Sequence, residues 1–172
     1  MTFEVSEKCM ERASRYLAYK QRTRQELCRH LRDRGFSEEE IKSCADQLEE
    51  YNLLNDLEYS SLYIESMLQR GRGIERIRRE LMTKGVDRNT IEDAIAQMED
   101  LPDEEELAME QAMLMLDGID TSGMDYAERE KIKARIARRL AGRGFRTDTV
   151  YRVCRQAMDR AAVEPDLANE ED

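Results

Sequence analysis

The chain has 172 residues, of which 38% are charged and 6% are aromatic, with two prolines and no tryptophan. This composition favours helices, because strands are rich in β-branched and aromatic residues. The formal net charge of −10 argues against a protein that simply coats nucleic acid. No apolar run is long enough for a signal peptide or for a membrane span of roughly 20 residues, so we expect a cytoplasmic protein without membrane contact.

One apolar pattern occurs three times along the chain. Its clearest copy, Ile74 to Met98, reads as a helix, a glycine turn and a second helix. The core leucines of the three copies are Leu31, Leu81 and Leu140, at offsets of 50 and then 59 residues. Self-similarity of this length indicates one supersecondary unit stacked on the next. We therefore expect an all-α fold of three tandem three-helix repeats in an elongated, curved array.

The first repeat is expected to cover residues 6–50. Apolar residues at helical spacing predict its first helix, from about Ser6 to Lys20. Capping boxes open the second and third helices, at Thr23 to Glu26 and at Ser37 to Glu40. Between them, Gly35 permits the left-handed conformation that ends many helices.

The second and third repeats are expected at residues 51–100 and 103–163. In the second, the predicted boundaries are a cap at Asn55 or Asp56, a break at Gly71 to Gly73, a turn at Gly85 and a cap at Asp87. In the third they are a helix start near Asp103, a cap at Asp125 with Glu128, a helix end near Gly144 and a last helix from Thr147 to about Val163. A loop at residues 117–123 is expected to account for most of the difference between the two offsets, 59 residues against 50. Residues 164–172 contain one proline and five acidic residues, which predicts a disordered acidic tail.

Basic residues recur in register with the three core leucines. Arg22, Arg72 and Lys131 stand nine residues before them, Arg29, Arg79 and Arg138 stand two before, and Arg34, Lys84 and Arg143 stand three after. The first two sets are seven residues apart, which in a helix places them on one face and turned away from the core. Further arginines lie nearby at Arg24, Arg32, Arg76, Arg78, Arg135 and Arg139.

A periodic basic stripe suits a periodic anionic partner, such as a DNA backbone or an acidic protein polymer. The alternative is that each arginine belongs to a solvated face and pairs with a carboxylate four residues away on the same helix. The residues that we assign to partner binding are Arg22, Arg29, Arg72, Arg76, Arg79, Lys131, Arg135 and Arg138.

No sequence pattern indicates an enzyme, a metal site or a cofactor. The chain has no GxxxxGK[ST] loop for a nucleotide and no Cys/His pairing for a nucleophile. Its four cysteines are scattered, and a zinc site would need clustered Cys and His, whereas His30 is the only histidine. We expect ordinary reduced cysteines, because a buried free cysteine behaves as a small apolar residue.

Several motifs resemble those of the RecX family of bacterial recombination regulators. They are Ala13 to Leu17, Arg24 to Leu27 with Leu31, Gly35 and Phe36, the junction Leu53 to Tyr59, and the block Gly73, Arg76, Ile77, Glu80, Leu81, Lys84, Gly85, Val86 and Ile91. The similarity covers Met10 to Met98 well and the third repeat more loosely. Ser60 and Ser61 stand where the family more often has alanine, and the acidic tail is not part of the pattern.

This resemblance implies a function as a negative modulator of RecA, the recombinase that forms filaments on single-stranded DNA. RecX-family proteins bind the filament, reduce its growth or stability, and lower its ATPase, strand-exchange and coprotease activities. A direct nucleic-acid-binding repeat protein and a helical scaffold for another acidic partner remain as alternatives, and weak DNA binding could accompany the first function. The acidic first turn of the third helix (Glu38 to Glu40) argues against base readout, since phosphate would repel it. Groove binding and end capping of the filament are both compatible with the sequence, and a monomer is expected.

Overall fold

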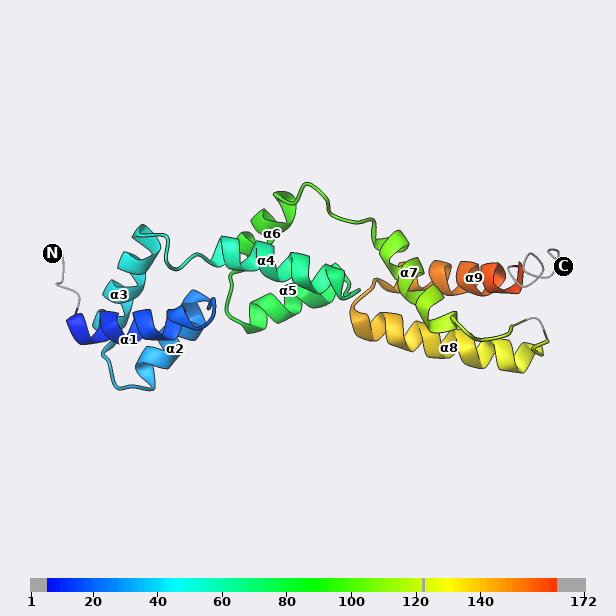
Figure 1. Cartoon of the computed structure of the whole chain (residues 1–172), viewed down its shortest axis with the longest axis horizontal. Coiled ribbons are helices and arrows are strands. Elements are labelled where there is room, and N and C mark those ends of the chain that lie inside the picture. Colours follow the sequence, from blue (N-terminus) through cyan, green and yellow to red (C-terminus); the bar gives the residue numbers. More distant parts are fainter. Residues whose placement is uncertain (1–5, 122, 164–172) are drawn as a thin grey trace. The chain divides into compact units, whose positions relative to one another are not determined.

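The computed structural model describes residues 6–121 and 123–163, and every regular element in these ranges is an α-helix (Figure 1). The helices are α1 (Glu7–Ala18), α2 (Arg24–Arg32), α3 (Glu38–Glu50), α4 (Asp56–Gln69), α5 (Ile74–Thr83), α6 (Arg88–Ala96), α7 (Glu104–Leu116), α8 (Tyr126–Arg143) and α9 (Thr147–Val163). The expected all-α fold with three helices to each repeat is confirmed. The acidic tail lies outside the described residues.

The described residues form two compact units. One contains residues 6–65 and 78–99, and the other contains residues 66–77 and 100–163. Helices α4 and α5 each contribute to both units. The repeat boundaries and the curved array stay predictions.

Local signals account for the helix starts. Thr23 and Ser37 each accept a hydrogen bond from the backbone amide three residues on. The glutamate at that position accepts one in turn from the backbone amide of the cap residue. At α4 the cap is Asn55, whose Oδ1 accepts from the amides of Leu57 and Glu58 at 3.1 and 3.0 Å. The predicted caps of α6, α7 and α8 are confirmed at Asp87, Asp103 and Asp125.

The expected glycine follows the end of each second helix. Gly35, Gly85 and Gly144 have φ angles of +87°, +86° and +92°, a region that glycine adopts without a steric penalty. The core leucines Leu31, Leu81 and Leu140, four residues before these glycines, are fully buried.

Each unit has its own apolar core. In the first unit, buried residues of α1, α2 and α3 pack together, among them Ala13, Leu27 and Ile41. In the second unit, α7, α8 and α9 supply a larger cluster that includes Ala112, Ile136 and Val153. Burial of such side chains contributes roughly 1.5–3 kcal/mol each relative to exposure, which holds the short helices of each unit together.

The longer second offset, 59 residues against 50, has two sources: the longer loop before α8, as expected, and the added turns of α8 itself. Helix α8 has 18 residues where α5 has 10. The loop before α8 covers residues 117–125, and the loop before α5 covers residues 70–73. The added helical turns lie at the N-terminal end of α8 and carry Lys131.

Candidate functional site

One basic residue occupies the same exposed position on the second helix of each repeat. Arg29 on α2, Arg79 on α5 and Arg138 on α8 are all exposed, although each lies two residues before a fully buried leucine. Two residues along a helix correspond to a rotation of about 200°, so a buried leucine turns the arginine toward solvent. We call Arg29, Arg79 and Arg138 the register arginines.

The basic residues nine positions before the core leucines do not form the expected helical stripe. They are Arg22, Arg72 and Lys131. Arg22 precedes Thr23, the N-cap of α2, and Arg72 precedes Gly73 at the start of α5, so neither lies on its helix. The prediction that residues seven apart share one helical face therefore fails for Arg22 and Arg72. It holds in the third repeat, where Lys131 and Arg138 both belong to α8.

Arg22 has contacts that favour a role in packing. Its guanidinium carbon lies 4.6 Å from the centroid of the Tyr16 ring, a cation–π geometry. Its Nε atom is buried and has no hydrogen-bond partner among the described residues. Arg72 is half-buried in the loop between α4 and α5.

Three nearby arginines pair with acidic residues of the third helix in their repeat. Arg24 bonds Asp46 at 2.6 Å and also contacts Glu49. Arg32 pairs with Glu38, and Arg78 forms two 3.0 Å hydrogen bonds to Glu92. Such pairs tie α2 to α3 and α5 to α6. They differ from the alternative in the sequence analysis, which expected pairs four residues apart on one helix.

The network around Asp46 also affects its ionisation. Lys42 Nζ lies 2.7 Å from this carboxylate, and Arg24 donates to it from α2. Hydrogen bonds from Lys42 and then from Arg24 hold the pKa of Asp46 below its usual value. Asp46 therefore stays ionised as an anchor for both cations.

Two of the basic residues three positions after the core leucines, Lys84 and Arg143, lie where successive repeats meet. Lys84 Nζ lies 3.6 Å from the Glu26 carboxylate within the first unit. Within the second unit, Arg143 donates to the carbonyl oxygens of Arg70 and Gly71 at 2.9 and 3.2 Å. Arg76 likewise donates to the Gly142 carbonyl. These side chains hold helix ends together, which places Arg76 at a junction rather than on an open face.

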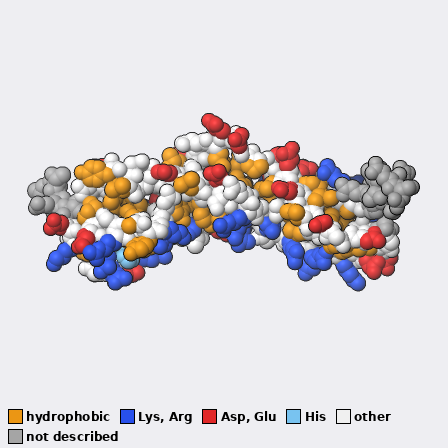
Figure 2. Space-filling model, viewed as in Figure 1, with side chains coloured by type: hydrophobic (Ala, Val, Ile, Leu, Met, Phe, Trp, Pro, Cys, Tyr) orange, Lys and Arg blue, Asp and Glu red, His pale blue; other side chains and the backbone are white. Residues whose placement is uncertain are grey.

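Helix α8 carries a continuous basic surface. Lys131, Arg135 and Arg138 are exposed at spacings of four and three residues, so they share one face of this helix. Figure 2 shows Lys and Arg side chains gathered in the part of the second unit where Figure 1 places α8. We call Lys131, Arg135 and Arg138 the α8 basic face.

A groove of about 490 Å³ runs between α8 and α9 beside this face. Its apolar lining comes from Ala134, Ala137, Ala141, Val150, Tyr151 and Cys154, and its charged lining from Glu130, Lys133 and Arg138. Tyr151 remains 74% exposed. The sequence analysis missed this groove, because the exposure of Tyr151 beside the buried Val150 is seen only in the structure.

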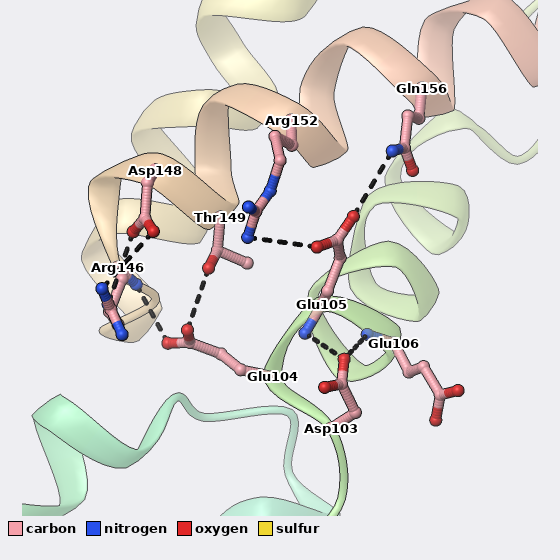
Figure 3. Close-up of polar contacts among 9 residues, drawn as sticks. All are labelled: Asp103, Glu104, Glu105, Glu106, Arg146, Asp148, Thr149, Arg152 and Gln156. Atoms are coloured by element: carbon pink, nitrogen blue, oxygen red, sulfur yellow. Dashed lines mark hydrogen bonds and ion pairs between the residues drawn. The ribbon is translucent and has the colours of Figure 1, made fainter.

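The acidic run at the start of α7 holds the second unit together (Figure 3). Glu104 accepts hydrogen bonds from the Arg146 amide at 3.1 Å and from the Thr149 hydroxyl at 2.9 Å. Glu105 pairs with Arg152 at 3.1 Å. These contacts join α7 to α9, so this part of the acidic sequence is structural.

Neither a metal nor a membrane is indicated by the described part of the chain. Within residues 6–121 and 123–163, no group of three or more His, Cys, Asp or Glu side chains could hold a metal ion. No helix in these ranges is both long and apolar enough to span a bilayer.

Comparison with known proteins identifies the family. Models of the first and second three-helix domains of RecX match residues 9–48 and 55–95. A regulatory protein RecX from Streptomyces coelicolor is 36% identical over 140 residues, which cover 80% of this chain and 71% of the relative. One from Clostridium perfringens is 29% identical over 157 residues, covering 91% and 72%.

The fold agrees with that of a solved relative. The crystal structure of RecX from Lactobacillus salivarius matches with a TM-score of 0.70 at 26% identity, over 87% of this chain and 94% of the other. The members named here are regulatory proteins rather than enzymes, in keeping with the absence of a catalytic pattern in the sequence. The chain belongs to the RecX family of regulatory proteins.

Proposed function

We propose that this protein binds the RecA filament on single-stranded DNA and restrains its growth or stability. ATP hydrolysis, strand exchange and LexA cleavage by RecA would fall as a result. Membership in the RecX family supplies the partner. The observation that carries the binding mode is the register arginines, which are exposed at one position in all three repeats.

Repetition makes weak contacts effective. A single exposed ion pair is worth roughly 0–1 kcal/mol, because solvent screens it. A filament presents the same surface many times, so three linked contacts act at a high effective concentration once the first has formed. The register arginines and the α8 basic face would together provide such contacts.

Direct competition for DNA is the second candidate, and the charge distribution weighs against it. The formal net charge is −10, and the first turn of α3 carries Glu38, Glu39 and Glu40. Glu38 is partly neutralised by Arg32 at 2.5 Å, but Glu39 is exposed. Phosphate-driven binding would weaken steeply as salt rises, so direct DNA affinity that does not change with salt would exclude this mode.

The test is a charge reversal with a matched control. One variant combines Arg29→Glu, Arg79→Glu and Arg138→Glu, and the control combines Arg12→Glu, Arg88→Glu and Arg155→Glu at exposed positions outside the register. Both change the net charge equally. The protein is kept below the concentration of RecA. ATP hydrolysis on single-stranded DNA should then fall with the natural protein and with the control. The variant at the register arginines should need at least a tenfold higher concentration for the same inhibition.

Circular dichroism should show equal helix content for all three proteins. Equal inhibition by the two variants would remove the register arginines from the mechanism. Inhibition only when the protein exceeds the available DNA sites would instead support competition for DNA. No inhibition by the natural protein with its cognate RecA would reject the proposed function.

A further inference from the structure

The groove between α8 and α9 has no occupant among the described residues, and its chemistry is specific. Its floor is mainly alanine and valine, which leaves room for a small apolar side chain. Lys133 and Arg138 line it, and Lys131 and Arg135 continue the positive charge along α8. The carboxylate that faces it is Glu130, at the N-terminal end of α8. The fitting ligand is therefore an extended acidic peptide with one apolar residue.

We propose that the chain's own C-terminal segment, residues 164–172, docks in this groove and covers the α8 basic face. The segment has the sequence EPDLANEED, with Leu167 and Ala168 between Asp166 and the three terminal acidic residues. Leu167 would enter the alanine-lined floor, and Glu170 to Asp172 would lie near Arg138 and Arg135. The segment is too short and too acidic to form a core of its own, so it can be ordered only by another surface.

The distances allow this arrangement. Residue 164 directly follows Val163, the last residue of α9. At about 1.5 Å per residue of helix, Cys154 lies about 14 Å back along α9 and Thr147 about 24 Å back. If residues 164–166 turn the chain, the six residues 167–172 span about 20 Å when extended, which reaches past Cys154. The sequence Glu164-Pro165-Asp166 has the composition of a turn, which would reverse the chain at the end of α9.

Charge distinguishes this groove from another one in the same unit. The second groove is lined by Met113, Leu114, Ile119 and Ala161, so it lies closer to the end of α9. Its charged lining residues are Glu110 and Asp117. Both would repel an acidic segment. In the groove beside α8, Glu130 lies 3.4 Å from Lys133 and offsets its charge, so Arg138 supplies most of the attraction.

Docking of the tail would reduce access of an anionic partner to Arg135 and Arg138. The interaction is intramolecular and exposed to solvent, so it should weaken as salt screens it. The docking itself does not depend on the proposed function. The effect of docking on RecA inhibition rests on the proposed function. Docking and inhibition are therefore measured separately.

Docking can be observed in the full chain by nuclear magnetic resonance. A spin label is placed at Asn169→Cys in a Cys28→Ser background, since the other three cysteines are buried. The label should broaden the backbone amide signals of Ala137, Arg138 and Tyr151 more than those of Leu114 and Ile119. High salt should remove the broadening, as should neutralisation of the tail by Glu164→Gln, Asp166→Asn, Glu170→Gln, Glu171→Gln and Asp172→Asn.

A matched variant controls for net charge. It neutralises five exposed acidic residues elsewhere, by Glu39→Gln, Glu50→Gln, Glu65→Gln, Asp93→Asn and Glu99→Gln, and should retain the broadening. A mixture of isotope-labelled protein and separately spin-labelled protein should show none, since broadening there would mean that a second copy provides the tail. No broadening in the groove, or broadening centred on Ile119, would overturn the proposal.

The effect of tail docking on RecA is measured separately, as inhibition of ATP hydrolysis. The tail-neutralised protein should inhibit RecA ATP hydrolysis at a severalfold lower concentration than the natural protein, and the matched control should not. Broadening without a change in inhibition would keep the docking but reject its regulatory effect. If the natural protein does not inhibit at all, the proposed function fails while the docking result stands.

Discussion

The Thr23 hydroxyl donates a 2.6 Å hydrogen bond to the carbonyl oxygen of Lys84, which joins the start of α2 to the end of α5. In the second unit, the Gly73 amide donates to the Arg143 carbonyl at 2.9 Å. Gly73 and Arg143 occupy the same repeat positions as Thr23 and Lys84. One repeat junction therefore occurs twice, with a hydroxyl donor in one case and an amide donor in the other.

Replacement of Thr23 by valine should destabilise the protein by about 2–3 kcal/mol. Thr23 is fully buried, and its hydroxyl also accepts from the Glu26 amide at 3.2 Å. Valine keeps the volume but removes the cap, worth about 1 kcal/mol, and leaves the Lys84 carbonyl without its donor. Urea denaturation followed by circular dichroism would measure the change.

Ser37→Ala is the matched control for that experiment. Ser37 forms the same capping box at α3, but it is exposed, and its hydroxyl bonds are local. Its loss should cost only about 1 kcal/mol, the value of a cap. Equal destabilisation by both variants would show that the bond from Thr23 to Lys84 adds no stability.

Gly144→Ala should be clearly more destabilising than Gly35→Ala. Both glycines have positive φ angles, so alanine pays a similar backbone penalty of about 1 kcal/mol at either position. A Cβ on Gly144 would lie 2.2 Å from the Cβ of Arg76 and 2.7 Å from its backbone nitrogen, whereas one on Gly35 would meet nothing within 4 Å. The difference in unfolding free energy between the two variants measures the close approach at the junction, and no difference would mean that the junction opens freely.

Local rules explain what could be predicted from the sequence. Caps such as Thr23 and Asn55 and the turn at Gly144 act over three or four residues, so composition at those positions suffices. The pairing of Arg24 with Asp46 depends on how α2 packs against α3, which spacing along one helix does not reveal. The predicted basic stripe fails at Arg22 and Arg72 for a different reason, because both residues lie outside the helices.

The groove beside α8 was beyond the sequence for a related reason. It needs two helices to be placed before its lining residues meet, since Ala137 and Tyr151 come from different helices. The shared helical face of Lys131 and Arg138 was predictable, because both lie on α8 at a spacing of two turns. Arg22 and Arg72 had the same spacing from their partners, but the chain is not helical there.

His30 should titrate below its ordinary pKa of 6.5. Its ring stacks on Tyr16 with centroids 4.0 Å apart. Burial lowers the pKa of His30, and the charges of Arg34 and Arg12 lower it further. Because the folded pKa lies below the unfolded one, the free energy of unfolding should fall as pH drops from 6.5 through the folded value. The chain has a single histidine, so its ring proton signals give this pKa without ambiguity.

Arg34→Gln provides the control for His30. This variant removes one nearby positive charge from an exposed position and leaves the stacking on Tyr16 in place. The pKa of His30 should rise toward 6.5 in it, while the natural protein stays lower. A pKa at or above 6.5 in the natural protein would contradict the burial and charge argument.

The four thiols should react with Ellman's reagent in a fixed order. All four cysteines are free, and Cys28 is half-buried while Cys9, Cys44 and Cys154 are buried. Burial raises the pKa of each thiol, to about 12 for Cys44, and the thiolate is the reactive form. In the native protein at mildly alkaline pH, Cys28 should react first, and the other three should react only as fast as the structure opens. Cys28→Ser should remove the early phase, and denaturant should make every remaining thiol react at once. Fast reaction of two or more thiols in the native protein would show that a helix covering them opens readily.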